Sequence, residues 1–287
     1  MKTLFSIKGN SQKLDGGAMF GNAPKAVWQK WVEVDEQNRI NLACRALLVK
    51  DGDRHILFEL GIGAFFEPKL KDRFGVVESN HVLLDSLAQV GLSHEDIDVI
   101  VLSHLHFDHA GGFLSEWQAD QPPQLLFPNA AVIVGKVAWE RATHPHPRDR
   151  ASFIPPLMAL LAERPNVHLV EDATHPLLGA DYRFHFSHGH TPGMMLTEIL
   201  TSQGSVVFCA DLIPGEPWVH LPITMGYDRF AEQLIDEKQA LLDELIQRNG
   251  WLFFTHDNQT ALGRLYKNEN HKFSVCDRQS ELVEYSM

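Results

Sequence analysis

The sequence predicts an α/β protein in which two β-sheets pack face to face and helices cover their outer sides. Short apolar runs, typical of buried strands, alternate with amphipathic helix patterns, and the strand patterns fall into two groups. Hydrophobic residues make up 44% and charged residues 22% of the 287 residues, the composition of a globular protein with a sizeable core. No linker or low-complexity segment divides the chain, so we expect residues 1–287 to form a single domain.

The first group of predicted strands begins after turns at Gly9-Asn10 and at 15–17, within an N-terminal region that we read as β-structure. An amphipathic helix is predicted around residues 83–90, with Gly91 as its end. The run Val-Ile-Val-Leu at 99–102 is wholly apolar, as in a strand buried on both faces. The predicted strands of this group lie at residues 42–49, 56–60 and 99–102.

The second half repeats this style. A helix near Val137, a loop rich in His, Pro and Arg, and a helix at 156–162 separate the first two strands. A long helix is expected from about 228 to 248, ended by Asn249-Gly250; its predicted apolar stripe is Phe230, Leu234, Leu241 and Leu245. The predicted strands of this half lie at 131–134, 167–170, 183–187, 195–200, 206–210 and 251–254.

Charge and cysteine usage exclude several classes of protein. The formal net charge of −12 would repel DNA or RNA, and the mixed segment 141–150 reads as a solvated loop rather than a basic patch, so no nucleic-acid partner is expected. Three widely spaced cysteines without a CxxC pair argue against a disulfide framework and against a structural zinc knuckle. We expect a cytoplasmic protein without a membrane partner, since no signal peptide or spanning run is visible.

A dense group of metal-binding residue types directly follows the apolar run at 99–102. The six residues after Ser103 are His-Leu-His-Phe-Asp-His. In an extended segment alternate side chains share a face, so His104 and His106 can bind one metal ion together. A turn would then direct Asp108 and His109 toward a neighbouring position. Imidazole and carboxylate ligands suit zinc, and an unpaired cluster of this kind would be costly to bury, so a metal site is predicted here.

Three later residues stand in the same position relative to predicted strands. His190 lies in the turn Gly-His-Thr-Pro-Gly after the strand at 183–187, Asp211 follows the strand at 206–210, and His256 follows the strand at 251–254. Taken alone, Asp211 reads as a capping residue and His256 as a surface histidine. Because a sheet brings several strand ends together, the three positions complete the predicted metal site.

At these residues the chain resembles the metallo-β-lactamase superfamily. The segment 104–109 is similar to its His-x-His-x-Asp-His signature, 189–193 to its second histidine motif, and the similarity extends from about 42 to 257. The resemblance implies a four-layer αββα sandwich of two mixed β-sheets flanked by helices, with the site at one edge. It also implies two divalent metal ions, zinc first with iron or manganese as alternatives. One ion would be held by His104, His106 and His190 and the other by Asp108, His109 and His256, with Asp211 and a hydroxide bridging them.

The expected reaction is hydrolysis of a small-molecule ester, lactone or phosphoester by the metal-bridging hydroxide, with Asp108 carrying a proton to the leaving group. Homoserine-lactone lactonases carry a similar first segment, but Pro214 stands where they have a tyrosine; Tyr227 is the substitute candidate, although packing is its commoner role. Glu59 stands where the family often has a supporting aspartate, and Met194 where many relatives have histidine. The stretch after Asp211 also looks like that of organophosphate-hydrolysing relatives.

Several alternatives stay open. An iron-dependent persulfide dioxygenase of the same fold would use one metal, and a non-catalytic sensor would bind metal without turnover. The tRNA-processing branch, the diiron branch and the β-lactamases proper fit the residues less well. Residues 143–150 are either a lid or an exposed connector, and the oligomeric state is not readable. Gly111-Gly112 would let the backbone start a helix; Phe20, Trp218 and Met225 line a pocket or belong to the core.

Overall fold

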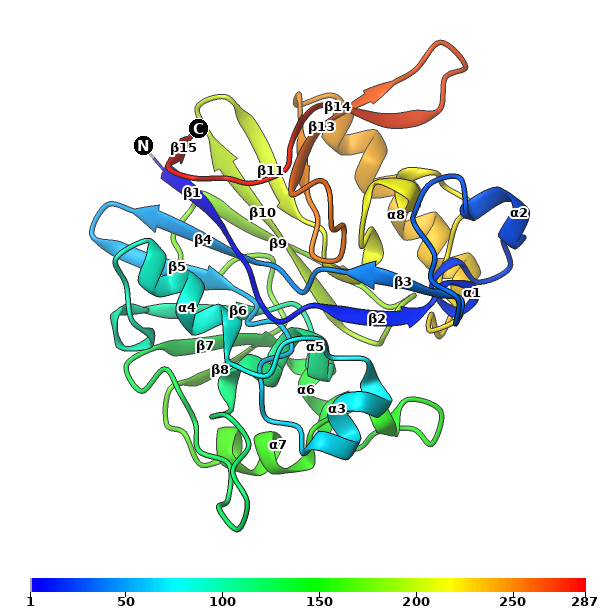
Figure 1. Cartoon of the computed structure of the whole chain (residues 1–287). Coiled ribbons are helices and arrows are strands. Elements are labelled where there is room, and N and C mark those ends of the chain that lie inside the picture. Colours follow the sequence, from blue (N-terminus) through cyan, green and yellow to red (C-terminus); the bar gives the residue numbers. More distant parts are fainter. Residues whose placement is uncertain (1) are drawn as a thin grey trace.

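The computed structural model describes residues 2–287 and contains two mixed β-sheets packed face to face, with helices on their outer sides (Figure 1). The first sheet has seven strands in the order β15-β1-β4-β5-β6-β7-β8, and the second has six in the order β14-β13-β12-β11-β10-β9. A separate hairpin pairs β2 with β3. The predicted αββα sandwich is confirmed.

The first sheet and the hairpin contain β1 (Lys2–Ile7), β2 (Gln12–Asp15), β3 (Arg39–Leu42), β4 (Ala46–Asp51), β5 (Arg54–Phe58), β6 (Val99–Leu102), β7 (Ala131–Gly135), β8 (Val167–Val170) and β15 (Tyr285–Ser286). The second sheet contains β9 (Tyr182–Ser187), β10 (Met194–Thr201), β11 (Gly204–Phe208), β12 (Trp251–Phe253), β13 (Leu262–Lys267) and β14 (Phe273–Gln279). The α-helices are α1 (Gly16–Phe20), α2 (Lys25–Trp28), α3 (Pro68–Phe74), α4 (Val82–Gln89), α5 (Phe107–Ala110), α6 (Lys136–Thr143), α7 (Pro155–Ala162) and α8 (Ala231–Ile246). None of these described helices is long and apolar enough to cross a membrane.

Side-chain alternation along the first sheet divides the apolar core into two layers. Val99 and Val101 of β6 pack toward the second sheet, in an apolar cluster that continues through that sheet to the apolar side of α8. Ile100 and Leu102 pack in the opposite layer, beneath α4, α6 and α7. Successive side chains of a strand point to opposite faces, so one wholly apolar strand contributes to both layers. The prediction of a strand buried on both faces at 99–102 is confirmed.

The carboxyl ends of five strands meet at one edge of the two packed sheets. β5 and β6 run parallel, as do β11 and β12, and β9 shares the direction of β11 because both are antiparallel to β10. A backbone hydrogen bond of 2.8 Å from Met195 N to Ser103 O connects the two sheets there. Residues that follow these strands therefore converge on the same edge.

The predicted strand at 42–49 is wrong in its middle. β3 ends at Leu42 and β4 begins at Ala46. Between them, Ala43 N donates to His256 O at 3.2 Å and Arg45 N donates to Thr255 O at 3.0 Å. Between the hairpin and the first sheet the chain bonds with the segment after β12, which ties the two sheets together beside His256.

The long helix is shorter than predicted, and its buried stripe differs. It spans Ala231–Ile246, and Phe230, at its N-cap, is 54% exposed, so assigning Phe230 to the apolar stripe is wrong. Lys238 takes part in the stripe instead: it is 0% exposed, and its ammonium donates to the carbonyls of Trp218 at 3.0 Å and Ile223 at 2.8 Å. A lysine can be buried in this way because backbone oxygens satisfy its donors.

The C-terminal strands were not predicted from the sequence. β13 and β14 extend the second sheet beyond β12, and β15 returns to pair with β1 at the edge of the first sheet (Figure 1). Their polar and apolar residues alternate only over short stretches, so they lack the apolar runs that mark β6 and β11. The helices α1, α2 and α3 were also not predicted, and α1 begins at Gly16, within the predicted turn at 15–17. Most elements with predicted bounds begin and end within a few residues of them.

Candidate metal centre

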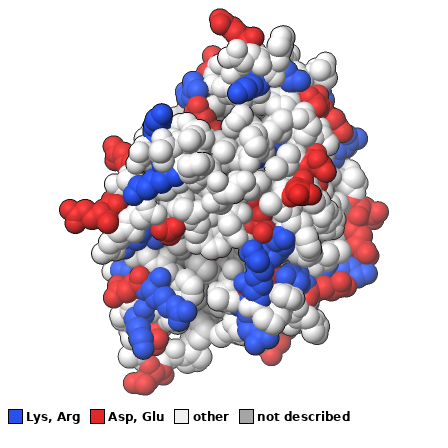
Figure 2. Space-filling model, turned by 90° about the vertical axis from the view of Figure 1, so that its right-hand side faces the viewer, with Lys and Arg blue, Asp and Glu red and all other residues white. Residues whose placement is uncertain are grey.

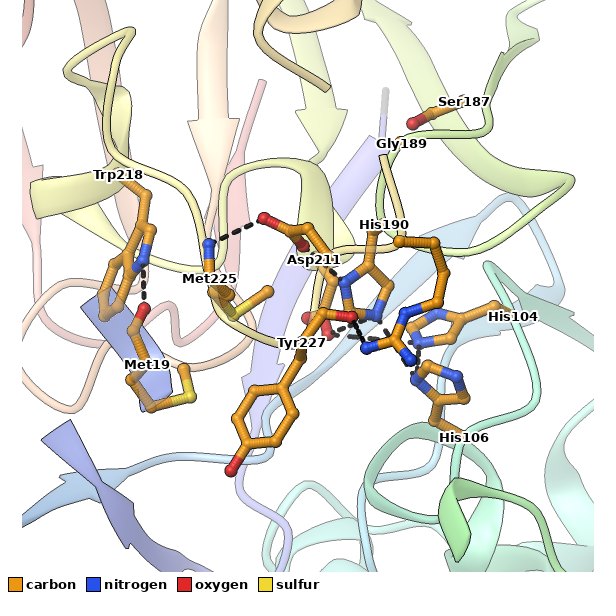
Figure 3. Close-up of polar contacts among 12 residues, drawn as sticks. Met19, His104, His106, Ser187, Gly189, His190, Asp211, Trp218, Met225 and Tyr227 are labelled. Carbon is orange, nitrogen blue, oxygen red and sulfur yellow. Dashed lines mark hydrogen bonds and ion pairs between the residues drawn. The ribbon is translucent and has the colours of Figure 1, made fainter. Parts of the chain in front are cut away.

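Four buried side chains from three strand ends form the first group of candidate ligands. His104 and His106 follow β6, His190 follows β9, and Asp211 follows β11, and one ligand atom of each lies within 4.8 Å of the others (Figure 3). His106 Nδ1 lies 3.0 Å from His104 Nε2 and 3.3 Å from His190 Nε2. The ligand atoms therefore converge on a common point from three directions.

Three side chains form the second group. Asp108 and His109 lie on the short helix α5, and His256 follows β12. His109 Nε2 and His256 Nε2 are 3.2 Å apart, and the Asp108 Oδ2 atom lies 3.7 Å from each. Asp108 is the more accessible member, since its side chain is 15% exposed while the two imidazoles are buried.

Asp211 faces both groups. Its Oδ1 atom lies 3.3 Å from His109 Nε2 and 3.1 Å from His256 Nε2. Its Oδ2 atom lies 3.1 Å from His190 Nε2 and 4.0 Å from His104 Nε2. The carboxylate reaches this place from a tight turn after β11, where Ala210 has a φ of +43°, unusual for a residue with a Cβ. All seven predicted site residues are thus brought together, and one carboxylate stands between the two groups.

Glu59 orients two of the imidazoles through their Nδ1 atoms, one directly and one through Ser103. It follows β5 at a φ of +62°, and its Oε2 atom accepts a hydrogen bond of 2.8 Å from His109 Nδ1. The hydroxyl of Ser103 donates to Oε1 and lies 2.8 Å from His104 Nδ1, where it accepts. One carboxylate therefore orients a histidine of each group. The supporting part expected for Glu59 in place of aspartate agrees with these contacts.

Two further acceptors orient His190 and His256, and sequence reasoning missed both. Asp228 Oδ1 accepts from His190 Nδ1 at 2.9 Å, while its Oδ2 accepts from Met225 N at 2.6 Å. The carbonyl of Ala43 accepts from His256 Nδ1 at 2.7 Å. Asp228 lies in a loop with no motif around it, and a backbone carbonyl leaves no mark in a sequence.

The outer hydrogen bonds decide which nitrogen of each ring points inward. His109, His190 and His256 donate from Nδ1, so in the neutral ring Nε2 carries a lone pair directed at the carboxylate of Asp211. Inward lone pairs and carboxylate oxygens at such distances repel one another unless positive charge lies between them. The donor set, nitrogen and oxygen in two groups sharing a carboxylate, fits two divalent metal ions.

The pKa values of the imidazoles follow from the same geometry. Burial, aided by the neighbouring histidines, lowers the pKa of His104 and His106 well below the usual value. For His109, burial acts in the same direction, but the charges of Glu59 and Asp211 outweigh it and raise the pKa well above the usual value. Without metal, protons supply the positive charge that the second group needs, and metal binding would displace them.

The helix α8 fixes the loop that carries His190. The Glu237 carboxylate accepts from the Ser187 hydroxyl at 2.6 Å, from His188 N at 2.9 Å and from Gly189 N at 3.1 Å. Figure 3 shows Ser187 and Gly189 above the ring of His190. Lys238, the next residue of α8, donates hydrogen bonds to backbone carbonyls of the loop that leads to Asp228. Adjacent residues of one helix therefore position a candidate ligand and the group that orients it.

The two glycines at 111 and 112 begin a short helix, as expected, and they also allow a close backbone contact. The helix α5 spans Phe107–Ala110, and a 3-10 helix follows it at Gly111–Phe113. A Cβ atom on Gly111 would lie 2.2 Å from the carbonyl oxygen of Ile62, and one on Gly112 would lie 2.1 Å from that of Leu60. The glycines let this segment approach the backbone that follows Glu59.

A cavity of about 240 Å³ opens in front of the candidate ligands. Tyr227 lines it and is 38% exposed, so the packing role favoured for this residue is wrong. Met225 also lines it, whereas Phe20 stacks on Trp218 with ring centroids 4.5 Å apart, and both rings are buried in the core. Part of the 143–150 loop reaches the cavity through Arg148 and its neighbours.

An apolar groove of about 540 Å³ adjoins this cavity. Phe74, Phe107 and Ala151 line both spaces, so the two share a wall. The groove is walled by α3, by the loop after Leu114 and by the segment before α7; its aromatic residues are Phe65, Phe66, Phe74, Phe107, Trp117 and Phe153.

Solved structures share this architecture over nearly the whole chain. A probable metal-dependent hydrolase from Staphylococcus aureus is 26% identical, with a TM-score of 0.87 over 100% of this chain and 98% of its own. AidC, a dizinc quorum-quenching lactonase in complex with the product N-hexanoyl-L-homoserine, is 23% identical, with a TM-score of 0.75 over 96% of this chain and 94% of its own.

Curated relatives match shorter stretches. An N-acyl homoserine lactonase from a Bacillus species is 26% identical over 183 residues, 63% of this chain and 64% of the relative. A cytochrome P450 monooxygenase, mpaDE, from Penicillium roqueforti is 29% identical over 108 residues, 34% of this chain but 12% of the relative. The chain thus spans less than two thirds of the length of these relatives.

The family model for the metallo-beta-lactamase superfamily matches residues 40–256, which is most of the chain and includes all seven candidate ligands. The fold, the clustered histidine and aspartate side chains and this match agree. The chain belongs to the metallo-beta-lactamase superfamily and has the architecture of its metal-dependent hydrolases.

Proposed function

We propose that this protein hydrolyses a small-molecule carboxylic ester or lactone, using two divalent metal ions, zinc first, held by the seven residues of the candidate centre. The observation that carries the proposal is the position of Asp211, whose two oxygens face two separate groups of ligand atoms. A mononuclear dioxygenase would need the first group alone. The complete second group of Asp108, His109 and His256 therefore favours the binuclear hydrolase.

The bound ions would supply a water of lowered pKa and a positive charge that polarises the bond under attack. The side chains of the chain then divide the remaining work. Glu59 and Asp228 hold the imidazoles in one orientation, so that the ligand atoms keep their places during the reaction. Asp108, the most exposed of the seven, is placed to carry a proton to the leaving group.

The substrate class follows from the space in front of the centre. An apolar groove adjoining the cavity suits the acyl chain of an ester or lactone. The lactonases among the relatives agree with this choice. Tyr227 lines the cavity, and burial together with the charge of Asp108 raises the pKa of its hydroxyl, which therefore remains a donor at neutral pH for a bound carbonyl oxygen.

A hydrolysis panel tests the proposal. Purified protein with a measured metal content is assayed with acyl lactones, acyl esters and phosphotriesters of matched chain length. We expect turnover of the acyl lactones or esters, and loss of that turnover on chelation with recovery on adding zinc. Turnover of the phosphotriesters alone would show that the bond cleaved is a phosphoester. Metal binding without any turnover would support a non-catalytic metal sensor.

Asp108→Ala, assayed together with its metal content, tests proton transfer by Asp108. We expect this variant to have lower turnover, with the loss smallest for substrates whose leaving group needs no proton, such as 4-nitrophenolate. Full turnover with both metals retained would remove Asp108 from the mechanism.

A further inference from the structure

Two arginines line the cavity in front of the centre, and neither has a carboxylate partner. Arg148 and Arg229 face this cavity together with His106, Asp108 and His190. In the described part of the chain, no aspartate or glutamate oxygen lies within 4.0 Å of either guanidinium. The net charge of the protein is −12, so two uncompensated positive charges at this place need a physical reason.

The nearest carboxylates are already engaged. Asp149 is 4% exposed and accepts two hydrogen bonds from Arg141, at 2.7 and 2.8 Å. Asp228 binds His190 and the backbone of Met225. Both hydrogen bonds from Arg141 go to Oδ2 of Asp149, and the Oδ1 atom is buried without a partner in the described part of the chain. Neither Asp149 nor Asp228 forms an ion pair with Arg148 or Arg229.

The guanidinium of Arg229 is fixed at one end and unsatisfied at the other. One terminal nitrogen, Nη2, donates to the carbonyl oxygen of Tyr227. The other, Nη1, is buried without an acceptor among residues 2–287, and His106 Nε2, in a residue of the same cavity wall, is also buried without a partner. Buried donors are nearly always paired, so this wall is built to receive an acceptor from outside the chain.

The positive charges of Arg148 and Arg229 affect each other and the charge of the surface around the cavity. Burial lowers the pKa of Arg229, and the charge of Arg148 lowers it further, so the two groups are close enough to repel. Figure 2 shows a hollow in the face presented, with Lys and Arg side chains gathered beside it. Asp108, Asp149 and Asp211 also line the cavity, but two of these carboxylates belong to the candidate metal centre and the third pairs with Arg141. The two arginines are therefore the groups of this wall that can attract an anionic part of a ligand.

We propose that Arg229 and Arg148 bind an anionic group of the substrate, so that the substrate is an ester or lactone carrying a carboxylate or another oxyanion away from the bond that is cleaved. This inference rests on the proposed hydrolysis and narrows its substrate class. A guanidinium presents paired donors that match the oxygens of such a group. The anion sits against the arginine wall, and an apolar part of the substrate extends into the adjoining groove.

Matched esters test the inference. Mono-4-nitrophenyl adipate has a carboxylate where 4-nitrophenyl hexanoate has its terminal methyl group. We expect wild type to favour the adipate by about tenfold or more in kcat/KM, since a charged hydrogen bond typically gives at least this factor. Arg229→Gln and Arg148→Gln should raise KM for the adipate about tenfold and leave the hexanoate within about twofold. Arg150→Gln, an exposed arginine of the same loop outside the cavity wall, is the matched control and should change neither.

A binding measurement separates this inference from the proposed hydrolysis. Hexanesulfonate, a poor metal ligand, should bind wild type and bind Arg229→Gln about tenfold more weakly by calorimetry, while hexanol should not distinguish the two. Hydrolysis of both esters with the same preference in wild type and both Gln variants would overturn the inference and leave the hydrolase intact. Without any hydrolysis the proposed function fails, and equal sulfonate binding by wild type and Arg229→Gln would then overturn the anion site as well.

Discussion

The two halves of the metal centre are built in different ways. The half contributed by the first sheet comes from one stretch of six residues, 104–109, and its supporting group, Glu59, lies on the neighbouring strand end. The half contributed by the second sheet comes from three positions, His190, Asp211 and His256, which span more than sixty residues. The first half is positioned by local backbone geometry, whereas the second depends on distant contacts.

The helix α8 supplies most of those distant contacts. Glu237 binds the loop before His190, and Lys238 binds the loop before Asp228. The first half has no comparable helix, because Gly111 and Gly112 let its segment lie directly on the backbone after β5. Ligands that come from one short segment are positioned by close packing of its backbone on the neighbouring strand end. Ligands that come from separate loops are positioned by side chains that hydrogen-bond to those loops. The predictions below test how far a change in one half reaches the other.

The largest effect should come from Asp211, whose carboxylate faces both groups of ligand atoms. Asp211→Asn keeps the size of the side chain but replaces one ligand oxygen with an amide and removes the negative charge between the two groups. We expect both metal ions to bind much more weakly and turnover to fall to the level without metal. The measurement is metal content together with hydrolysis. Asp243→Asn, on the exposed side of α8, is the control. An Asp211→Asn protein that held both ions with wild-type affinity would contradict the shared role.

Removing the anchor of the second half should lower stability. Lys238→Met leaves the carbonyls of Trp218 and Ile223 buried without their donor. We expect the free energy of unfolding to fall by on the order of 3 kcal/mol, since each unsatisfied buried group costs about 1–3 kcal/mol. Urea unfolding measures the change. Lys267→Met removes an exposed lysine paired with Asp243 and should shift the value by less than about 0.5 kcal/mol. Equal shifts in the two variants would show that the buried lysine has no anchoring role.

The orienting carboxylates should differ in how many ions they affect. Glu59 contacts His109 directly and His104 through Ser103, so Glu59→Gln should weaken the binding of both ions by about 10–100-fold. Asp228 contacts His190 alone among the ligands, so Asp228→Asn should weaken one ion by a similar factor and spare the other. Titration with a competing chelator resolves the two affinities. The comparison fails if Asp228→Asn weakens both ions equally.

The smallest effect concerns acid stability of the second sheet. Burial disfavours a charged Glu198, but hydrogen bonds from His185 and Ser205 and the charge of Arg248 outweigh it and lower its pKa from 4.5 to about 2. Because the pKa in the folded state is the lower one, the stabilisation is complete above the unfolded value and is lost as the pH falls toward about 2. Unfolding of wild type and Glu198→Gln between pH 6 and pH 2 measures this, at roughly constant ionic strength. The stability difference between them should shrink with falling pH, and a constant difference would contradict the assignment.

Sequence reasoning recovered the parts of this molecule that depend on local patterns. β6 and the segment after it were predicted together, because four apolar residues followed by alternating histidines leave few other structures. The convergence of His190, Asp211 and His256 with that segment followed from the rule that parallel strand ends share an edge.

What the sequence did not reveal depends on contacts between distant residues. Asp228, Glu237 and Lys238 look like ordinary polar residues of a loop and a helix, and only the packing of α8 on the second sheet turns them inward. Arg148 sits in a loop that reads as solvated, and its position at the cavity depends on the fold. The strands β13 to β15 lack a long apolar run, because each lies near a sheet edge.

The measurement that tests the account most directly is the number of metal ions per chain. Elemental analysis of wild-type protein, purified without added metal and assayed for hydrolysis in the same sample, should give about two zinc ions per chain and turnover of an acyl ester or lactone. A single iron per chain without hydrolysis would contradict the binuclear account, and Asp211 would then be a group that orients the ligands rather than one that joins two metal ions.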